Sequence, residues 1–143
     1  MDVLQQFLRY PLADLPFIFL VLMIAFTVHE FSHAYFAYRF GDSTAKDLGR
    51  VSLNPRVHLD VVGTLLIFLA GFGWAKPVPV NRSRFKYPRL MGVVVSAAGP
   101  FSNLLTAFAG MLIIYLFSQF GWYDGMSVGV YKAVTHFLYY LIM

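Results

Sequence analysis

Two long stretches with almost no charge limit what this chain can fold into. Residues 15–28 are apolar except for Thr27, and residues 90–123 contain no Asp, Glu, Lys or Arg. A helix of about 20 apolar residues crosses the core of a bilayer and satisfies its own backbone hydrogen bonds there. Hydrophobic residues make up 59% of the sequence and charged residues 13%, against about 25% charged in typical soluble domains. The sequence therefore predicts an all-α membrane protein, in one domain over residues 1–143.

The apolar pattern predicts about three transmembrane helices. The first runs over residues 12–38, the second over residues 90–123, and a third begins near Val128. Residues 61–75 are also apolar, but they are only fifteen residues long and are interrupted by three glycines. This length favours a short or re-entrant segment over a full span.

A small extended or β region is expected in the loops. Residues 48–53 alternate weakly between apolar and polar, which is the pattern of a short strand. Residues 76–81 carry Pro77 and Pro79, which bar a central strand but suit an exposed extended edge. Such an edge is able to pair with a substrate backbone, and a plain loop stiffened by prolines is an equally good interpretation.

The basic residues gather in two loops beside the apolar segments. The net charge is +4, and the basic residues of the two loops are Arg39, Lys46, Arg50 and Arg56, then Lys76, Arg82, Arg84, Lys86 and Arg89. Cytoplasmic loops carry an excess of Lys and Arg, so both loops are expected on the cytosolic side, with the N-terminus outside. Membrane orientation explains this charge better than nucleic-acid binding does. The sequence does not specify an oligomeric state.

The sequence His-Glu-Phe-Ser-His at residues 29–33 places ionisable groups inside the first predicted span. On a helix, His29 and His33 project from one face with room for one metal ion, and Glu30 lies beside them. This is the pattern in which two imidazoles bind zinc and a glutamate takes a proton from the attacking water. The chain has no cysteine, so metal ligands must be nitrogen or oxygen atoms.

The depth of Glu30 argues against an ordinary polar helix boundary. Arg39 is the first clear boundary charge, so Glu30 lies about 13 Å below the interface at 1.5 Å per residue. Ionisable side chains at such depth are costly and mark functional sites. His58 and Asn103 are further candidates, for supporting the metal ligands or orienting a substrate; a solvated loop histidine and a simple interhelical hydrogen bond are their alternatives.

The chain resembles the site-2 protease family of intramembrane zinc metalloproteases, in particular its short bacterial members without a PDZ domain. The resemblance covers nearly the whole chain. It rests on these stretches: His-Glu-Phe-Ser-His at 29–33; Asp42-Ser43-Thr44-Ala45, Gly49-Arg50 and Leu53-Asn54-Pro55 with His58; Gly-Phe-Gly-Trp-Ala-Lys-Pro-Val-Pro-Val-Asn at 71–81; and Ala-Gly-Pro-Phe-Ser-Asn at 98–103.

The resemblance implies that His29 and His33 bind Zn²⁺ and that Glu30 is the general base. It implies a zinc-dependent endopeptidase that hydrolyses peptide bonds in the transmembrane segments of other membrane proteins, as in regulated intramembrane proteolysis. The expected location is the bacterial cytoplasmic membrane, with a multi-pass chain in the lipid bilayer and an active site towards the cytosol.

The chain departs from the family pattern at the third zinc ligand. The family has an aspartate in a Leu-Asp-Gly motif on a later helix, and this sequence has no such motif. Asp124 precedes a glycine, but the predicted topology puts it on the opposite membrane face. The helix near Val128 resembles the lead-in to the missing motif, so we expect a truncation at Met143. His136 remains as a substitute ligand.

Two other functions use the same residues. A metal-binding transporter or sensor would keep the histidines without hydrolysis, although the sequence shows no further full spans with polar lining residues. An inactive fragment or pseudoprotease would only bind partners. The missing third ligand favours this last reading, and the intact motif around Glu30 argues against it.

Overall fold

The computed structural model describes residues 8–143, and helices account for all of its regular secondary structure. The elements are η2 (Leu12–Asp14), α1 (Leu15–Arg39), α2 (Thr44–Asp47), η3 (Pro55–Val57), α3 (Val61–Ala70), η4 (Arg82–Arg84), α4 (Pro88–Gln119) and α5 (Val128–Ile142). The all-α prediction is confirmed. The predicted strand at residues 48–53 is not, because the chain turns there about Gly49, which has a φ of 68°.

The first two predicted spans correspond to α1 and α4. Both begin with a proline in the first helical turn, where the missing N–H costs no hydrogen bond. Leu12–Arg39 and Pro88–Gln119 are long and apolar enough to cross a membrane, and few of their residues are buried inside the molecule. Exposed apolar faces of this kind match a lipid environment rather than water.

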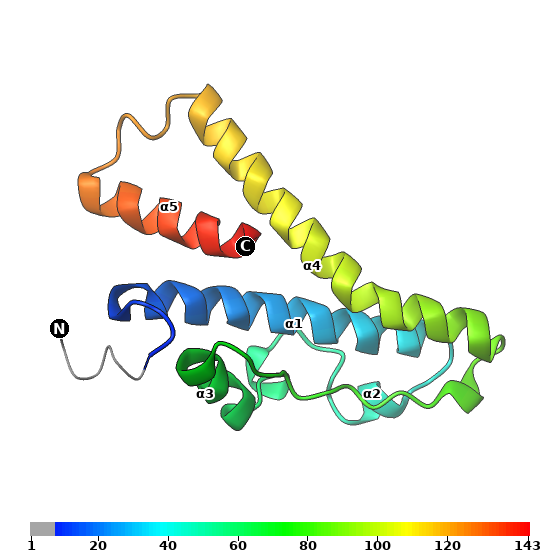
Figure 1. Cartoon of the computed structure of the whole chain (residues 1–143). Helices are drawn as coiled ribbons and strands as arrows, with labels where there is room; N and C mark the ends of the chain where they lie inside the picture. Colours follow the sequence, from blue (N-terminus) through cyan, green and yellow to red (C-terminus); the bar gives the residue numbers. More distant parts are fainter. Residues whose placement is uncertain (1–7) are drawn as a thin grey trace.

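Small residues allow α1 and α4 to approach closely. Ala34 and Ala37 of α1 are fully buried, and Val95, Ala98 and Gly99 of α4 are buried as well. The first half of α4 lies against the C-terminal half of α1, and the two helices then diverge (Figure 1). The close contact therefore lies beside the His-Glu-Phe-Ser-His sequence of α1.

The third predicted span is a shorter helix in the structure. α5 has 15 residues, or about 22 Å at 1.5 Å per residue, which is less than the roughly 30 Å core of a bilayer. Three transmembrane helices are therefore not confirmed. α5 returns between α4 and the start of α1 (Figure 1). Its side chains His136 and Tyr140 bond the carboxylate of Asp14 at 3.0 and 2.9 Å.

The short apolar segment forms α3, which has ten residues and is too short to cross a bilayer. Asp60 caps its start by accepting a hydrogen bond from Gly63 N at 2.8 Å. A Cβ on Gly63 would collide with the backbone of Trp74, so the chain after α3 packs directly against it. The re-entrant placement of this segment in a membrane stays a prediction.

Asp42 joins the two basic loops. Its carboxylate is fully buried and accepts hydrogen bonds from Thr44 N at 3.1 Å and Asn81 N at 2.6 Å, with the Arg84 guanidinium 3.8 Å away. Burial raises the pKa of Asp42, but these hydrogen bonds and the charge of Arg84 outweigh it and hold the pKa below its ordinary value. The loop after α1 and the loop before α4 therefore form one unit at one end of the helix pair.

Candidate active site

The two histidines of α1 face α4. His29 and His33 lie one turn apart, with ring centroids 4.7 Å apart and ring planes at 80°. His33 Nδ1 lies 2.6 Å from the carbonyl oxygen of Val95 on α4. A carbonyl only accepts hydrogen bonds, so Nδ1 of His33 carries the ring proton and Nε2 keeps a free lone pair.

Gly99 of α4 makes room for both imidazoles. A Cβ built on Gly99 would lie 2.6 Å from His29 Nε2 and closer still to His33 Nε2. The Nε2 atoms of both rings thus converge on a cradle that any larger residue would fill. Two imidazole nitrogens that converge on one point are a suitable pair of zinc ligands.

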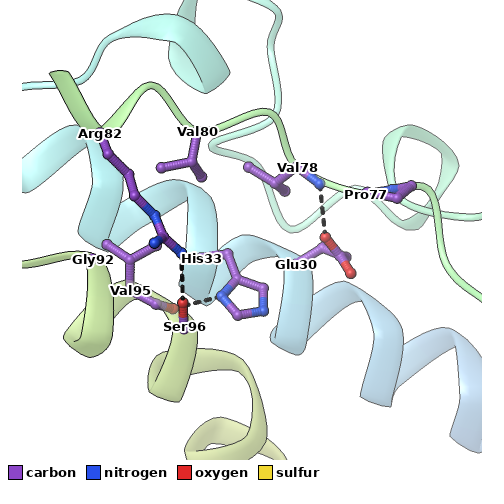
Figure 2. Close-up of a pocket in the computed structure, with 9 residues that line it drawn as sticks. All are labelled: Glu30, His33, Pro77, Val78, Val80, Arg82, Gly92, Val95 and Ser96. Atoms are coloured by element: carbon purple, nitrogen blue, oxygen red, sulfur yellow. Dashed lines mark hydrogen bonds between the residues drawn. The ribbon is translucent and has the colours of Figure 1, made fainter. Parts of the chain in front are cut away.

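Glu30 faces a different neighbour, the extended segment of residues 76–81. Its side chain is 8% exposed, and Oε2 accepts a hydrogen bond from the backbone N–H of Val78 at 3.1 Å. Figure 2 shows this hydrogen bond at one side of the pocket and His33 nearby on the same helix. The carboxylate is therefore fixed in orientation by a backbone donor.

Arg50 fixes the extended segment in turn. This side chain is 5% exposed and donates to the carbonyl oxygens of Lys76 at 2.5 Å and Pro77 at 3.2 Å. Lys76 N also donates to the carbonyl of His58 at 2.8 Å. Burial lowers the pKa of Arg50 and the negative charge of Glu30 opposes this, but an arginine stays protonated in any case. Arg50 thus holds the segment that holds Glu30.

A cavity of about 420 Å³ opens where these parts meet. Its lining residues are Glu30, His33, Pro77, Val78, Val80, Arg82, Gly92, Val95 and Ser96 (Figure 2). Arg82 reaches across to Ser96 Oγ at 3.4 Å. Small-molecule and peptide side-chain sites have volumes of this order, with a few polar groups among apolar walls.

The structure places the other predicted site residues at different distances from this cavity. Asn103 lies on α4 with its side-chain nitrogen 3.2 Å from His29 Nδ1. His58 is fully buried, does not line the cavity, and reaches Ser52 O through Nε2 at 2.7 Å. Burial and the positive charge of Arg50 hold the pKa of His58 below its ordinary value, although the hydrogen bond to Ser52 favours the protonated ring.

His136 does not complete the metal pair. It bonds Asp14, which precedes α1, and Asp14 is fifteen residues from His29 along the chain. At 1.5 Å per residue, this is about 22 Å along the helix axis. Asp124 lies in the turn between α4 and α5, away from both histidines. Within residues 8–143, no group of three His, Cys, Asp or Glu side chains is placed to hold a metal ion.

Sequence reasoning missed three parts of this site. The sequence places Arg50 in a basic loop, but its side chain is buried and donates to two carbonyls. The backbone N–H of Val78 has no signature in a sequence. Gly99 stood among small residues that indicate close helix packing, and that was the available signal for the cradle.

The residues present fit zinc as a partial ligand set. The donor atoms are imidazole nitrogens, both Nε2 atoms lie against Gly99 where a Cβ would clash with them, and Glu30 is the residue next to His29 on α1. Catalytic zinc sites normally use three protein ligands and a water, and the described residues supply two.

Comparisons with known proteins point to the same chemistry. The chain is 55% identical over 118 residues to the putative zinc metalloprotease YwhC of Bacillus subtilis (strain 168), a match that covers 82% of this chain and 54% of that protein. It is 31% identical over 90 residues to the putative zinc metalloprotease Rip2 of Mycolicibacterium smegmatis, covering 59% of this chain and 34% of that protein.

The matched segments thus span about half and about a third of these two relatives. No family model and no solved structure matches the chain. Both relatives are named as zinc metalloproteases, and the sequence carries the histidines and glutamate that such enzymes need. These two relatives therefore confirm the predicted resemblance to the site-2 protease family.

Proposed function

We propose that this chain carries the catalytic core of a zinc-dependent intramembrane endopeptidase, which cleaves the transmembrane segments of other membrane proteins. The observation that carries the proposal is that Glu30, His33 and an extended backbone edge line one cavity. A protease needs a base, a metal-binding group and a place for an extended substrate, and this cavity brings elements of all three together.

The chemistry divides between the metal and the chain. Zinc, when bound by His29 and His33, would polarise the scissile carbonyl and make water a better nucleophile. Glu30 takes the proton from the attacking water and passes it to the nitrogen of the departing amine. Because Val78 N–H occupies Oε2, we assign the proton transfer to Oε1.

The substrate in this proposal is a transmembrane segment that has locally unwound, because a helix hides its carbonyls in hydrogen bonds. In an extended chain, residues two apart direct their N–H groups to the same edge. Val78 N–H points to Glu30, so Val80 N–H lies on the cavity edge, while the nitrogens of Pro77 and Pro79 lie on the other edge. The prolines thus leave the cavity edge able to pair with a substrate backbone.

The proposed location is a bacterial cytoplasmic membrane, crossed more than once, with the site towards the cytosol. The support is that the two basic loops form one unit around Asp42, so both lie at the same end of α1 and α4. The positive-inside rule then places that end in the cytosol. His29 and Glu30 lie on α1 about two to three turns before that end.

Glu30→Gln tests the proposal. The glutamine keeps the size and the hydrogen bond to Val78 N but cannot accept the proton of the attacking water. We expect cleavage of single-span membrane proteins in liposomes, followed by mass spectrometry of the products, to fall by roughly 10²- to 10⁴-fold, the usual contribution of a general base.

Asp124→Asn is the matched control, because it makes the same chemical change at an exposed turn residue. It should leave cleavage unchanged. Cleavage by Glu30→Gln at the wild-type rate would show that Glu30 is not the base. A wild-type protein that binds zinc and cleaves nothing would leave metal binding without hydrolysis as the function.

A further inference from the structure

The side-chain amide of Asn103 lies against the ring nitrogen of His29 that faces away from the cradle. Asn103 Nδ2 is 3.2 Å from His29 Nδ1. Asn103 Oδ1 is buried and has no hydrogen-bond partner among residues 8–143. A buried polar atom without a partner is unfavourable, so the orientation of this amide has to be decided from its neighbours.

Two hydrogen-bond patterns are compatible with this contact, and they differ in their effect at His29 Nε2. If the amide nitrogen donates to Nδ1, the ring proton of His29 sits on Nε2 and points into the cradle at Gly99. If the amide oxygen accepts from Nδ1–H, Nε2 keeps a free lone pair. The two ends of an amide have the same shape, so their assignment follows from the hydrogen-bond network.

His33 shows which pattern the site requires. Its Nδ1 donates to the carbonyl of Val95, which leaves Nε2 free on the cradle side. Both Nε2 atoms face the space at Gly99, and one metal ion can bind both only if neither carries a proton. Imidazoles that bind metals typically donate their other N–H to a carbonyl, a carboxylate or a water.

We infer that Asn103 is a positioning residue that accepts the Nδ1 proton of His29 through its amide oxygen and so keeps His29 Nε2 free to bind zinc. This inference rests on the proposed function for the identity of the metal. It assigns the two imidazoles matching partners on α4, a backbone carbonyl for His33 and a side-chain carbonyl for His29. In this orientation the amide oxygen bonds His29, and the amide nitrogen takes the place where Oδ1 has no partner among residues 8–143.

The direct test is the ring protonation of His29 in the metal-free protein, read from side-chain ¹⁵N NMR with the signal assigned by its loss in His29→Gln. We expect the wild-type ring to be protonated at Nδ1. Asn103→Leu, which has a similar volume and no acceptor, should shift the ring toward protonation at Nε2. A role of Asn103 in helix packing alone would not change this signature.

Zinc affinity gives a second readout, measured by competition between the purified full chain and a colorimetric chelator. Asn103→Leu should weaken zinc binding by roughly 10- to 100-fold, as loss of such partners does elsewhere. Asn103→Asp, which keeps an acceptor at the same place, should restore binding to within a few-fold of wild type. Thr106→Val is the control: among residues 8–143, the Thr106 hydroxyl bonds the carbonyl of Ser102 in its own helix.

Protonation of wild-type His29 at Nε2, or wild-type zinc affinity in a folded Asn103→Leu protein, would overturn the inference. If Asn103→Leu does not fold, two measurements still test the inference: the NMR signature of wild-type His29 and the zinc affinity of Asn103→Asp. A zinc affinity of Asn103→Asp as low as that of His29→Ala would contradict an acceptor role for residue 103. Failure of the proposed function looks different: there the wild-type protein cleaves no substrate, or Glu30→Gln cleaves as fast as the wild type, whichever nitrogen of His29 carries the proton.

Discussion

At the scale of single residues, the absence of a side chain at Gly99 matters as much as the presence of the two imidazoles. The glycine sits on α4 directly opposite His29 and His33, and both Nε2 atoms face the space that a Cβ would take. Each ring also contacts α4 through its Nδ1 atom, so a ring that rotates away from Gly99 would lose that contact. The site is therefore sensitive to one methyl group on the facing helix.

Gly99→Ala should separate the helices or displace the rings. Overpacking of this kind costs about 1–3 kcal/mol, and we expect zinc affinity to fall by roughly 10-fold or more because the ligands leave their places. Gly129→Ala is the control, because a Cβ there meets nothing within 4 Å and should stabilise α5 slightly. Thermal unfolding in detergent and chelator competition measure both effects; equal zinc affinity in the two variants would contradict the cradle.

The candidate site residues stand out in the sequence, but the residues that hold them in place do not. His29, Glu30 and His33 stand out because ionisable groups are rare in an apolar helix. The burial of Arg50 and the fully buried state of His58 depend on contacts between residues more than 15 positions apart, as with Arg50 and Pro77. A pattern along the chain does not encode such contacts.

At the scale of elements, residues 76–81 complete the candidate site, because this extended segment lies against Glu30 of α1 and lines the cavity. This segment has no strand partner in the described residues and is held from outside by Arg50, by His58 O and by Asp42. Its extended form and its prolines were readable from the sequence. Its position over Glu30 was not, because that follows from the way α3 and the loop after α1 pack.

Removal of the Arg50 guanidinium should loosen this segment. Arg50→Met removes the donors to two carbonyls, and hydrogen bonds from a charged group contribute about 1.5–3 kcal/mol each, so we expect a loss of roughly 3–6 kcal/mol in stability. Cleavage should also fall, because the loosened segment no longer holds Glu30 in place. Arg56→Met, at an exposed loop position, should change stability by less than about 0.5 kcal/mol. Equal melting temperatures for the two variants in detergent would contradict the role of Arg50.

Val78→Pro tests the backbone donor without changing a charged group. The substitution deletes the N–H that bonds Glu30, so we expect cleavage to drop by roughly 10-fold or more while the helices remain folded by circular dichroism. Val78→Ala keeps the N–H and should retain most of the activity. Similar activity in Val78→Pro and Val78→Ala would show that the hydrogen bond to Glu30 does not matter.

At the scale of the whole molecule, two long helices and a loop unit form a frame that was largely predictable, and α5 was the exception. Length and apolar character predicted α1 and α4 to within a few residues at most ends. The same criteria predicted a third span where the structure has a 15-residue helix docked on Asp14. Hydropathy predicts that a segment is apolar but does not predict which helix it packs against.

The loop unit makes stability depend on pH. The pKa of His58 lies below its ordinary value of 6.5, so the unfolded chain takes up a proton that the folded chain does not, and stability falls as the pH drops below about 6.5. The pKa of Asp42 lies below its ordinary value of 3.8, so its contribution is complete above that pH and is lost as the pH falls through the folded value.

Thermal melting between pH 3 and pH 8 in detergent tests this account. His58→Gln should flatten the part of the profile just below pH 6.5, and Asp42→Asn should flatten the part below about pH 4. A wild-type melting temperature that stays constant from pH 7 to pH 5 would contradict the burial of a neutral His58.

The zinc content of the purified protein tests the central claim most directly. Elemental analysis would compare the wild-type chain, the His29→Ala, His33→Ala double variant and Glu30→Gln. We predict zinc in the wild-type protein, its loss in the double variant, and its retention in Glu30→Gln, whose cleavage falls by roughly 10²- to 10⁴-fold. Zinc that survives the removal of both histidines, or its absence from the wild-type protein as well, would contradict a metal centre built on His29 and His33.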